Sequence, residues 1–249
     1  PSWCAGGLKA GEYRITPDMS LKNLLQKMLK GDVIIYQLTF VEGQTYRDYL
    51  QLLENTEGIV KTTTAGDESV LMKMMGENHK SPEGLLFPDT YFYQKGETDA
   101  EILKRAHHHL QEVLAREWAA RAKDLPYQSP YDALIMASII EKETAVEAER
   151  TKIAGVFVRR LQTGMRLQTD PTVIYGLGQD YTGNLTRQNL ATPNPYNTYL
   201  NVGLPPTPIA NPGEASIHAA LNPEQGDALY FVATGEGRHH FSVTLDEHE

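Results

Sequence analysis

Residues 134–144 read LIMASIIEKET, an apolar run that ends in two glutamates. From Leu134 to Ile140 only Ser138 is polar. A helix that is apolar on nearly every side is a buried helix, not an amphipathic surface helix. The stretch therefore predicts a central helix of the protein core, inside a helix expected over residues 131–150.

The position of Glu143 on this helix suggests a chemical role. It follows Met136 by seven residues and Ile140 by three, so at about 100° per residue it continues their apolar stripe. Glu141 points roughly 160° away. A carboxyl group on a buried stripe has a raised pKa and can act as a general acid. The alternative is that Glu143 only begins the solvated, acidic second half of the helix, and periodicity alone leaves both interpretations open.

Composition and charge exclude several classes of protein. The chain has 249 residues, 41% hydrophobic and 22% charged, which is enough for one large or two modest domains. Its net charge is −9 and it contains no block of Lys or Arg. Because phosphate binding needs a concentrated basic face, the sequence does not predict a nucleic-acid partner. One cysteine excludes an internal disulfide framework and a Cys-based zinc site. The consecutive residues His107 to His109 splay by about 100° each on a helix, so no metal or cofactor is expected.

The N-terminal part contains a short internal repeat. Residues 14–25 and 39–50 share a layout at an offset of 25: a β-type run, a turn, Ser20 or Thr45, and then an apolar helix face. Ser and Thr start helices because they accept a hydrogen bond from a free amide of the first turn. The pattern predicts a strand–turn–helix unit that occurs twice.

The remaining patterns predict a mainly helical second region, which begins near Ser81 and Pro82. An α+β fold is expected, with domains at residues 1–80 and 81–249. Residues 191–213 hold six of the 14 prolines, which excludes regular secondary structure there. Helices are expected at 69–75, 98–122, 131–150 and 151–162, and a closing β hairpin at 229–232 and 240–243 around 235–237.

Two loops contain side chains that suit a sugar ligand. Amides and hydroxyls bond sugar hydroxyls and Tyr rings cover the apolar face of a pyranose, while prolines stiffen the loop. The alternative is an ordinary rigid surface loop. Asp170 before Pro171 fits a helix N-cap better than a second catalytic carboxylate. Asn211 with Glu214 likewise fits an N-cap with its capping-box partner. The loop residues considered for sugar binding are Gln168, Thr169, Tyr196, Asn197 and Tyr199.

At these residues the chain resembles the YceG-like endolytic murein transglycosylases. The matching segments are residues 83–91 (EGLLFPDTY), 137–144, 166–175 and 196–206. The resemblance covers nearly the whole chain from about Gly11 onward, and the N-terminal repeat resembles the LysM-like glycan-binding module of that family. It implies a small LysM-like α/β module, then a mainly helical, lysozyme-like catalytic domain with long loops and a small β hairpin.

The resemblance also implies an activity and a setting. The activity is cleavage of the β-1,4 bond after N-acetylmuramic acid within a peptidoglycan strand, leaving a 1,6-anhydro end, with no cofactor. The family's catalytic glutamate falls on Glu143, and Glu141 joins the five loop residues as a substrate-binding candidate. The setting is the bacterial inner membrane, held by an N-terminal anchor upstream of Pro1, with the catalytic part in the periplasm. Peptidoglycan synthases are candidate partners.

Two other classes of function stay open. A muramidase that hydrolyses the same bond would use Asp89, Asp170 or Glu141 as its second carboxylate. A non-catalytic glycan-binding scaffold would need only the N-terminal repeat, and it would leave Glu143 and the proline-rich loop unexplained.

Overall fold

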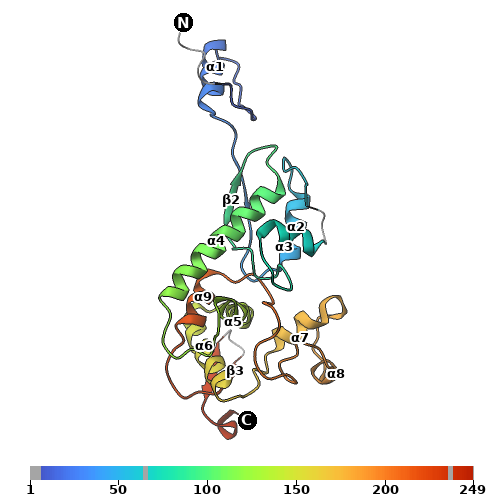
Figure 1. Ribbon diagram of the computed structural model, residues 1–249, viewed down its shortest axis with the longest axis vertical. Coiled ribbons are helices and arrows are strands. Elements are labelled where there is room, and N and C mark those ends of the chain that lie inside the picture. The colour runs from blue at the N-terminus through green and yellow to red at the C-terminus, as the bar shows by residue number, and fades with distance from the viewer. Residues whose placement is uncertain (1–6, 64–66, 235–237, 249) are drawn as a thin grey trace.

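The computed structural model describes residues 7–63, 67–234 and 238–248. Cys4 and the expected hairpin turn at 235–237 lie outside the described residues. The molecule is elongated, with the helical region at one end and the N-terminal segment at the other (Figure 1). Helices and two small antiparallel sheets share the chain, so the α+β class is confirmed. The elements are α1 (Leu21–Lys30), β1 (Tyr36–Thr39), α2 (Tyr46–Asn55), α3 (Glu68–Met75), β2 (Thr90–Tyr93), α4 (Asp99–Ala119), α5 (Pro130–Glu143), α6 (Glu147–Gln162), α7 (Asp170–Leu177), a 3₁₀ turn (Gly178–Asp180), α8 (Arg187–Ala191), α9 (Glu214–Leu221), β3 (Tyr230–Ala233), β4 (His239–Ser242) and α10 (Leu245–His248).

The central helix of the core is α5, as the apolar run predicts. Ser129 caps its first turn in a capping box with Asp132, and Pro130 takes the first helical position. All residues from 133 to 140 are buried, and α4, α6, α7 and α9 pack around the helix. Ser138, its one buried polar residue, donates to a carbonyl one turn back and accepts from the Ile209 amide at 3.0 Å. The proline-rich segment is thereby joined to the core helix.

The helix expected over 131–150 is in fact two helices. Thr144 adopts an extended conformation (φ −143°, ψ 137°), and its hydroxyl accepts a hydrogen bond from the Val146 amide at 3.0 Å. A new helix, α6, then starts at Glu147. No glycine or proline marks this break, so the sequence pattern missed it. Its consequence is that Glu143 is the last residue of α5.

Two hydrophobic clusters lie beneath the surface. One surrounds α5 and includes α6 and α9. The other joins residues between Leu38 and Leu71 to residues between Leu86 and Ala106. Strand β1 pairs with β2 in the register Tyr36 to Tyr93, which links the same two stretches. This second cluster spans both sides of residue 80, and the division of the chain there stays a prediction.

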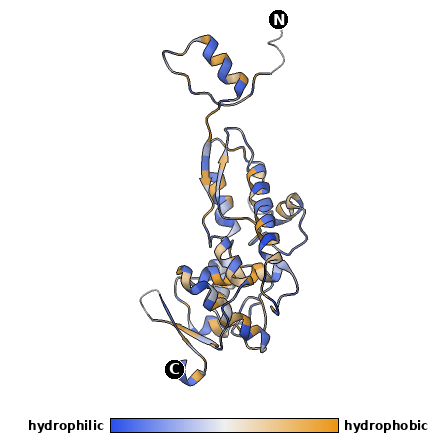
Figure 2. Ribbon diagram, turned by 90° about the vertical axis from the view of Figure 1, so that its left-hand side faces the viewer, coloured by the Kyte–Doolittle hydropathy of each residue, from blue (hydrophilic) through white to orange (hydrophobic). Residues whose placement is uncertain are grey.

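The two copies of the N-terminal repeat differ in structure. Ser20 and Thr45 cap α1 and α2 as expected, each accepting from an amide three residues on. The strand expected before the first helix, at residues 14–16, is absent, which corrects the prediction. Helix α1 is amphipathic in its colouring but buries none of its residues (Figure 2). The second copy forms a strand because β1 has β2 as a partner.

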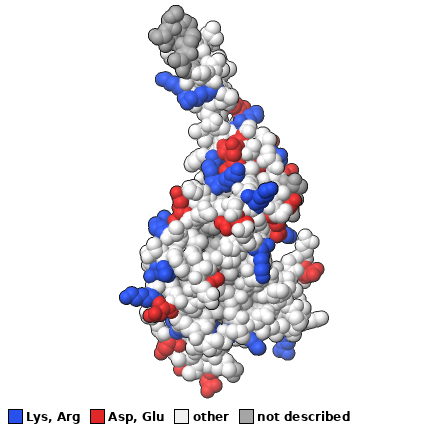
Figure 3. Space-filling view, in the orientation of Figure 1, with Lys and Arg blue, Asp and Glu red and all other residues white. Residues whose placement is uncertain are grey.

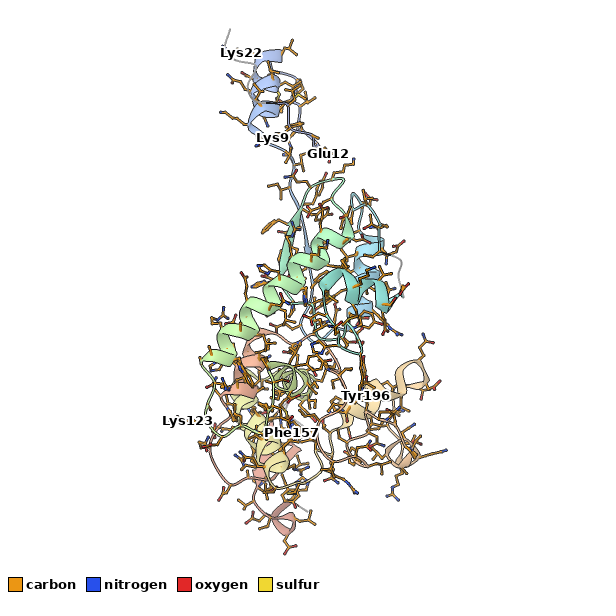
Figure 4. The ribbon with its side chains drawn as sticks, viewed as in Figure 1. Lys9, Glu12, Lys22, Lys123, Phe157 and Tyr196 are labelled. Carbon is orange, nitrogen blue, oxygen red and sulfur yellow. The ribbon has the colours of Figure 1, made fainter. Side chains whose placement is uncertain are left out.

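The C-terminal hairpin, β3 with β4, forms as expected in the register Phe231 to Phe241. Its Phe231 ring packs nearly perpendicular to the ring of Phe157 on α6, with 5.5 Å between the ring centres. Phe157 lies inside the helical region (Figure 4). Of the stretch 191–213, residues 192–213 have no helix or strand, as their prolines predict, and Ala191 is the last residue of α8. None of the helices in the described ranges has the length and apolar character needed to cross a membrane.

A buried carboxyl group, Glu83, lies between α2 and α7. Its side chain is 1% exposed, and its two oxygens accept hydrogen bonds from the Tyr46 amide (3.0 Å) and the Tyr175 hydroxyl (3.1 Å). Burial raises the pKa of Glu83 to about 7, although both hydrogen bonds favour the ionised form. The group therefore titrates near neutral pH in the folded chain.

The raised pKa of Glu83 predicts a pH dependence of stability. Below the unfolded pKa of 4.5 the group is protonated in both states. Between 4.5 and about 7 the folded chain holds a proton that the unfolded chain releases, so the free energy of unfolding falls as the pH rises. The total loss is on the order of 3 kcal/mol. Urea unfolding from pH 4 to 8 should show this fall in the native chain and lack it in Glu83→Gln. The exposed Glu54→Gln is the control, and identical pH curves for all three proteins would contradict the prediction.

Candidate active site

Glu143 opens into a cleft of about 510 Å³. The end of α5, the loop before α7, the β3–β4 hairpin and α10 contribute to its lining. Both polar and aromatic side chains face the space. Among those that line it are Glu143, Arg160, Gln168, Asp170, Tyr199, Tyr230, Phe231 and His239.

The carboxyl group of Glu143 has the electrostatic character that its sequence position predicts. Burial raises its pKa above the ordinary value, and the negative charge of Asp170 adds to this rise. A hydrogen bond from the Thr169 hydroxyl to Oε1 acts in the opposite sense. Glu143 therefore does not lie on a solvated acidic face, and a larger share of it stays protonated near neutral pH than for an exposed glutamate.

Gln168 and Thr169 are held against Glu143 by a cluster of buried threonines. The Thr198 hydroxyl accepts from the Thr169 amide at 3.1 Å and lies 2.8 Å from the Thr172 hydroxyl. The Gln168 amide donates to the Thr198 carbonyl at 3.2 Å. Gln168 itself has a left-handed backbone (φ 53°). Two loops that are distant in the sequence are thus joined beside the carboxyl group.

Asp170 and Tyr199 form a second pair in the cleft. The Tyr199 hydroxyl donates to Asp170 Oδ1 at 2.6 Å. The capping prediction for Asp170 is wrong by one residue: Thr169 is the N-cap of α7, and Asp170 is its first helical residue with Pro171 second. Because of this shift the Asp170 carboxylate lines the cleft instead of closing the helix end.

Tyr196 and Asn197, two of the predicted sugar-binding residues, are not among the residues that line the cleft. Asn197 is fully buried, and its amide donates to the carbonyls of Leu190 and Thr192, both at 3.0 Å. The Tyr196 hydroxyl lies 2.9 Å from that of Thr207, and its ring lies beside α7 (Figure 4). In this structure both residues hold the proline-rich loop in shape.

Glu141 also faces away from the cleft. Its Oε2 accepts from the Gly213 amide at 3.0 Å, and Gly213 is the N-cap of α9. The capping box expected from Asn211 and Glu214 is therefore wrong. Asn211 instead accepts from the Leu86 amide at 3.2 Å, and Glu214 pairs with Arg116 on α4.

Two basic side chains of the cleft, Arg160 and His239, are not among the site residues that the sequence predicts. Arg160 is 7% exposed, donates to the carbonyls of Leu229 (2.7 Å) and Leu167 (2.8 Å), and lies over the Tyr230 ring. His239 Nδ1 lies 2.8 Å from a carboxylate oxygen of Glu149. Arg160 continues the buried stripe of α6 by seven residues from Ile153, so the signal that identified Glu143 was present here too.

The three consecutive histidines of α4 splay as predicted. His107, His108 and His109 lie beside three different carboxylates, at 3.2, 3.3 and 3.4 Å. Among the described residues there is no group of three His, Cys, Asp or Glu side chains that could hold a metal ion. On the face shown in Figure 3, Lys and Arg alternate with Asp and Glu and form no basic patch.

The hydrogen bond from Thr169 predicts a measurable shift at Glu143. Thr169→Val keeps the side-chain shape but removes the donor that favours the charged form, so the pKa of Glu143 should rise further. A ¹³C NMR titration of the Glu143 carboxyl would measure this rise. Thr182 is exposed, and Thr182→Val should leave the pKa of Glu143 as it is in the native chain. An unchanged or lowered pKa in Thr169→Val would show that the hydroxyl does not control this group.

Comparison with known proteins identifies the family of the chain. The family model described as the YceG-like family matches residues 3–249. An endolytic murein transglycosylase of Bacillus subtilis is 35% identical over 267 residues, covering 98% of this chain and 72% of the relative. One of Streptococcus pneumoniae is 28% identical and covers 97% of this chain but only 50% of the relative.

A solved structure has the same fold over most of its length. The crystal structure of a YceG-like protein from Listeria monocytogenes matches with a TM-score of 0.68 and 33% identity, covering 97% of this chain and 84% of that one. Sequence and structure thus agree over nearly the full chain. This protein belongs to the YceG-like family.

Proposed function

We propose that the chain is an endolytic lytic transglycosylase of peptidoglycan. It would cleave the β-1,4 bond between N-acetylmuramic acid and N-acetylglucosamine within a glycan strand and leave a 1,6-anhydro end. The observation that carries the proposal is the carboxyl of Glu143, whose pKa is raised by burial and which lines a cleft together with polar and aromatic side chains. The names of the Bacillus and Streptococcus relatives support it.

One carboxyl group is sufficient for this reaction. Protonated Glu143 donates its proton to the glycosidic oxygen as the bond to the muramic acid C1 breaks. The C6 hydroxyl of the same sugar then bonds to C1, and the Glu143 carboxylate takes the hydroxyl proton. Because that hydroxyl is tethered, it has the high effective concentration of an intramolecular reaction and no water is needed. The carboxyl ends the cycle protonated, as it began.

The residues around Glu143 have separate roles in this proposed reaction. Asp170 favours the protonated form of Glu143, while the Thr169 hydroxyl stabilises the carboxylate that forms during the step. Gln168 and Tyr199 present an amide and a phenol ring to the cleft, suited to orienting the muramic acid. Tyr196, Asn197 and Glu141 support this arrangement through the loop and α9, without facing the substrate.

Hydrolysis by a muramidase is the second candidate, and Asp170 is the observation that favours it. Most glycosidases use two carboxyl groups, and Asp170 lines the same cleft as Glu143. The other two carboxylates considered for this role are engaged elsewhere: Glu141 accepts from Gly213, and Asp89 lies beside His109. The choice between the two reactions therefore depends on the product.

Mass spectrometry of the products from purified glycan strands tests the proposal. An anhydro product is lighter by one water than the product of hydrolysis, so the two reactions differ in mass at each new muramic acid end. New anhydro ends that arise from cleavage at internal bonds of long strands support the transglycosylase. If every new muramic acid end is a reducing end, the enzyme is a muramidase. If the strands stay intact, the protein is a non-catalytic glycan-binding scaffold.

The proposal extends to the N-terminal part and to the setting of the protein. Residues 1–80 would form the LysM-like glycan-binding module, and an anchor upstream would hold the catalytic part in the periplasm at the inner membrane, where synthases could bind. The repeated Ser20 and Thr45 caps support the first part. Removing residues 1–31, whose helix α1 buries no side chain, should weaken binding to insoluble peptidoglycan. Unchanged binding would assign those residues another role.

A further inference from the structure

A second hollow, of about 740 Å³, is lined in part by α5 and α7, the two helices that also contribute to the cleft. It is bounded by the start of α2, the end of α5 and one face of α7. Its size falls within the range of sites for small ligands. No step of the proposed reaction uses it. Its lining includes Arg47, Lys142, Pro171, Ile174, Tyr175 and Ile209.

The hollow and the cleft are close neighbours along two elements. At the end of α5, Glu143 lines the cleft and the preceding Lys142 lines the hollow. At the start of α7, Asp170 lines the cleft and the following Pro171 lines the hollow. Consecutive Cα atoms are about 3.8 Å apart. The two spaces are therefore separated by little more than a helix end and a first helical turn.

Among the residues that the structure describes, one cation that lines the hollow has no charged partner. Both oxygens of Glu83 accept hydrogen bonds from the protein, and Asp48 is held in the capping box with Thr45. Arg47 pairs with Glu68 at 3.1 Å.

Lys142 differs from these groups. It donates to the Gly43 carbonyl at 3.0 Å and forms no ion pair among the residues that the structure describes. An ammonium group has three donors, so two remain for a ligand. The apolar side of the hollow is formed by Pro171, Ile174 and Ile209. The chemistry fits a ligand that combines small apolar groups with a carboxylate.

We propose that this hollow binds the peptide stem of the glycan strand, with Lys142 pairing with a stem carboxylate. The inference rests on the proposed function. The stem is attached through a lactyl group to C3 of muramic acid, the sugar whose C1 would react at Glu143, so it must leave the cleft close to that residue. Stem peptides contain alanine methyls and carboxylates, which match the apolar side of the hollow and the ammonium group of Lys142.

Kinetics on two substrates test the proposal in the full chain. Strands that carry stems are compared with strands from which an amidase has removed them, for the native chain and for Lys142→Gln. Stem removal and Lys142→Gln should each raise KM by about 10-fold, equivalent to about 1.4 kcal/mol, and both together by no more than either alone. Lys152→Gln, an exposed lysine of α6, is the matched control and should leave both KM values unchanged.

A second measurement separates this inference from the proposed function. The free tripeptide L-alanyl-γ-D-glutamyl-L-lysine is titrated into the native chain, and the methyl signals of Ile174 and Ile209 are followed by NMR. Saturable shifts that Lys142→Gln weakens support the stem site even if no strand is cut. The stem-site inference would be overturned if the tripeptide causes no shifts. It would also be overturned if the KM increases from stem removal and from Lys142→Gln multiply when the two changes are combined. Strand cutting that is equally efficient with and without stems would reject the inference and keep the proposed function.

Discussion

Glu143→Gln should lower the rate of strand cleavage by about 10²-fold or more, since general acid catalysis contributes an effect of this size. Glutamine keeps the shape of the side chain and can still accept the hydrogen bond from Thr169, but it has no proton to donate at the pH of the reaction. Anhydro ends released per unit time, counted by mass spectrometry, measure the loss. Circular dichroism and the midpoint of thermal unfolding show that the chain stays folded.

Glu141→Gln is the matched control for this result. It removes a carboxylate two residues away on the same helix, and glutamine can still accept from the Gly213 amide. We expect most of the activity to remain. Activity kept in Glu143→Gln and lost in Glu141→Gln would move the catalytic role to the other glutamate.

The second large effect concerns stability. Gly84 has a left-handed backbone (φ +77°), and a Cβ atom built on it would lie 2.6 Å from Cγ of the rigid Pro208 ring and 3.3 Å from the Ala210 carbonyl oxygen. Gly84→Ala should therefore lower the free energy of unfolding by about 2–4 kcal/mol, combining about 1 kcal/mol of backbone strain with an overpacking cost. Urea denaturation of both chains measures this difference.

Gly76→Ala separates the two contributions. Gly76 ends α3 with nearly the same φ, +74°, but no atom of the described residues lies within 4 Å of a Cβ built there. It should lose only the backbone part, about 1 kcal/mol. If the two variants lose equal stability, close packing between Gly84 and Pro208 contributes nothing.

The candidate site shows which features a linear pattern can identify. The apolar stripe located Glu143 because helical period and composition are local properties of a few consecutive turns. Asp170 was misjudged because a shift of one residue in the helix start changes a capping side chain into a cleft side chain. Asn197 was predicted to bind sugar because the sequence shows only a polar side chain in a loop. It does not show whether that side chain bonds a sugar or, as here, two backbone carbonyls.

The secondary structure of the N-terminal repeat was also predictable only where it depends on neighbouring residues. The helix starts at Ser20 and Thr45 were predictable, because a cap depends only on residues within one turn. The strand before α1 was not, because a strand needs a hydrogen-bonding partner. Strand β1 finds that partner in β2, more than 50 residues further along the chain, and the first copy pairs with no strand among the described residues.

The sequence by itself thus determined the buried central helix, the carboxyl on its apolar stripe, and the absence of regular structure in the proline-rich segment. Only the tertiary structure decided where α5 ends and what surrounds its last residue. The Thr169 hydroxyl that bonds Glu143 comes from 26 residues further along, and the phenol that bonds Asp170 from 29 residues beyond that carboxylate. Such contacts depend on how loops close over the core, and chain-local patterns carry no information on that closure.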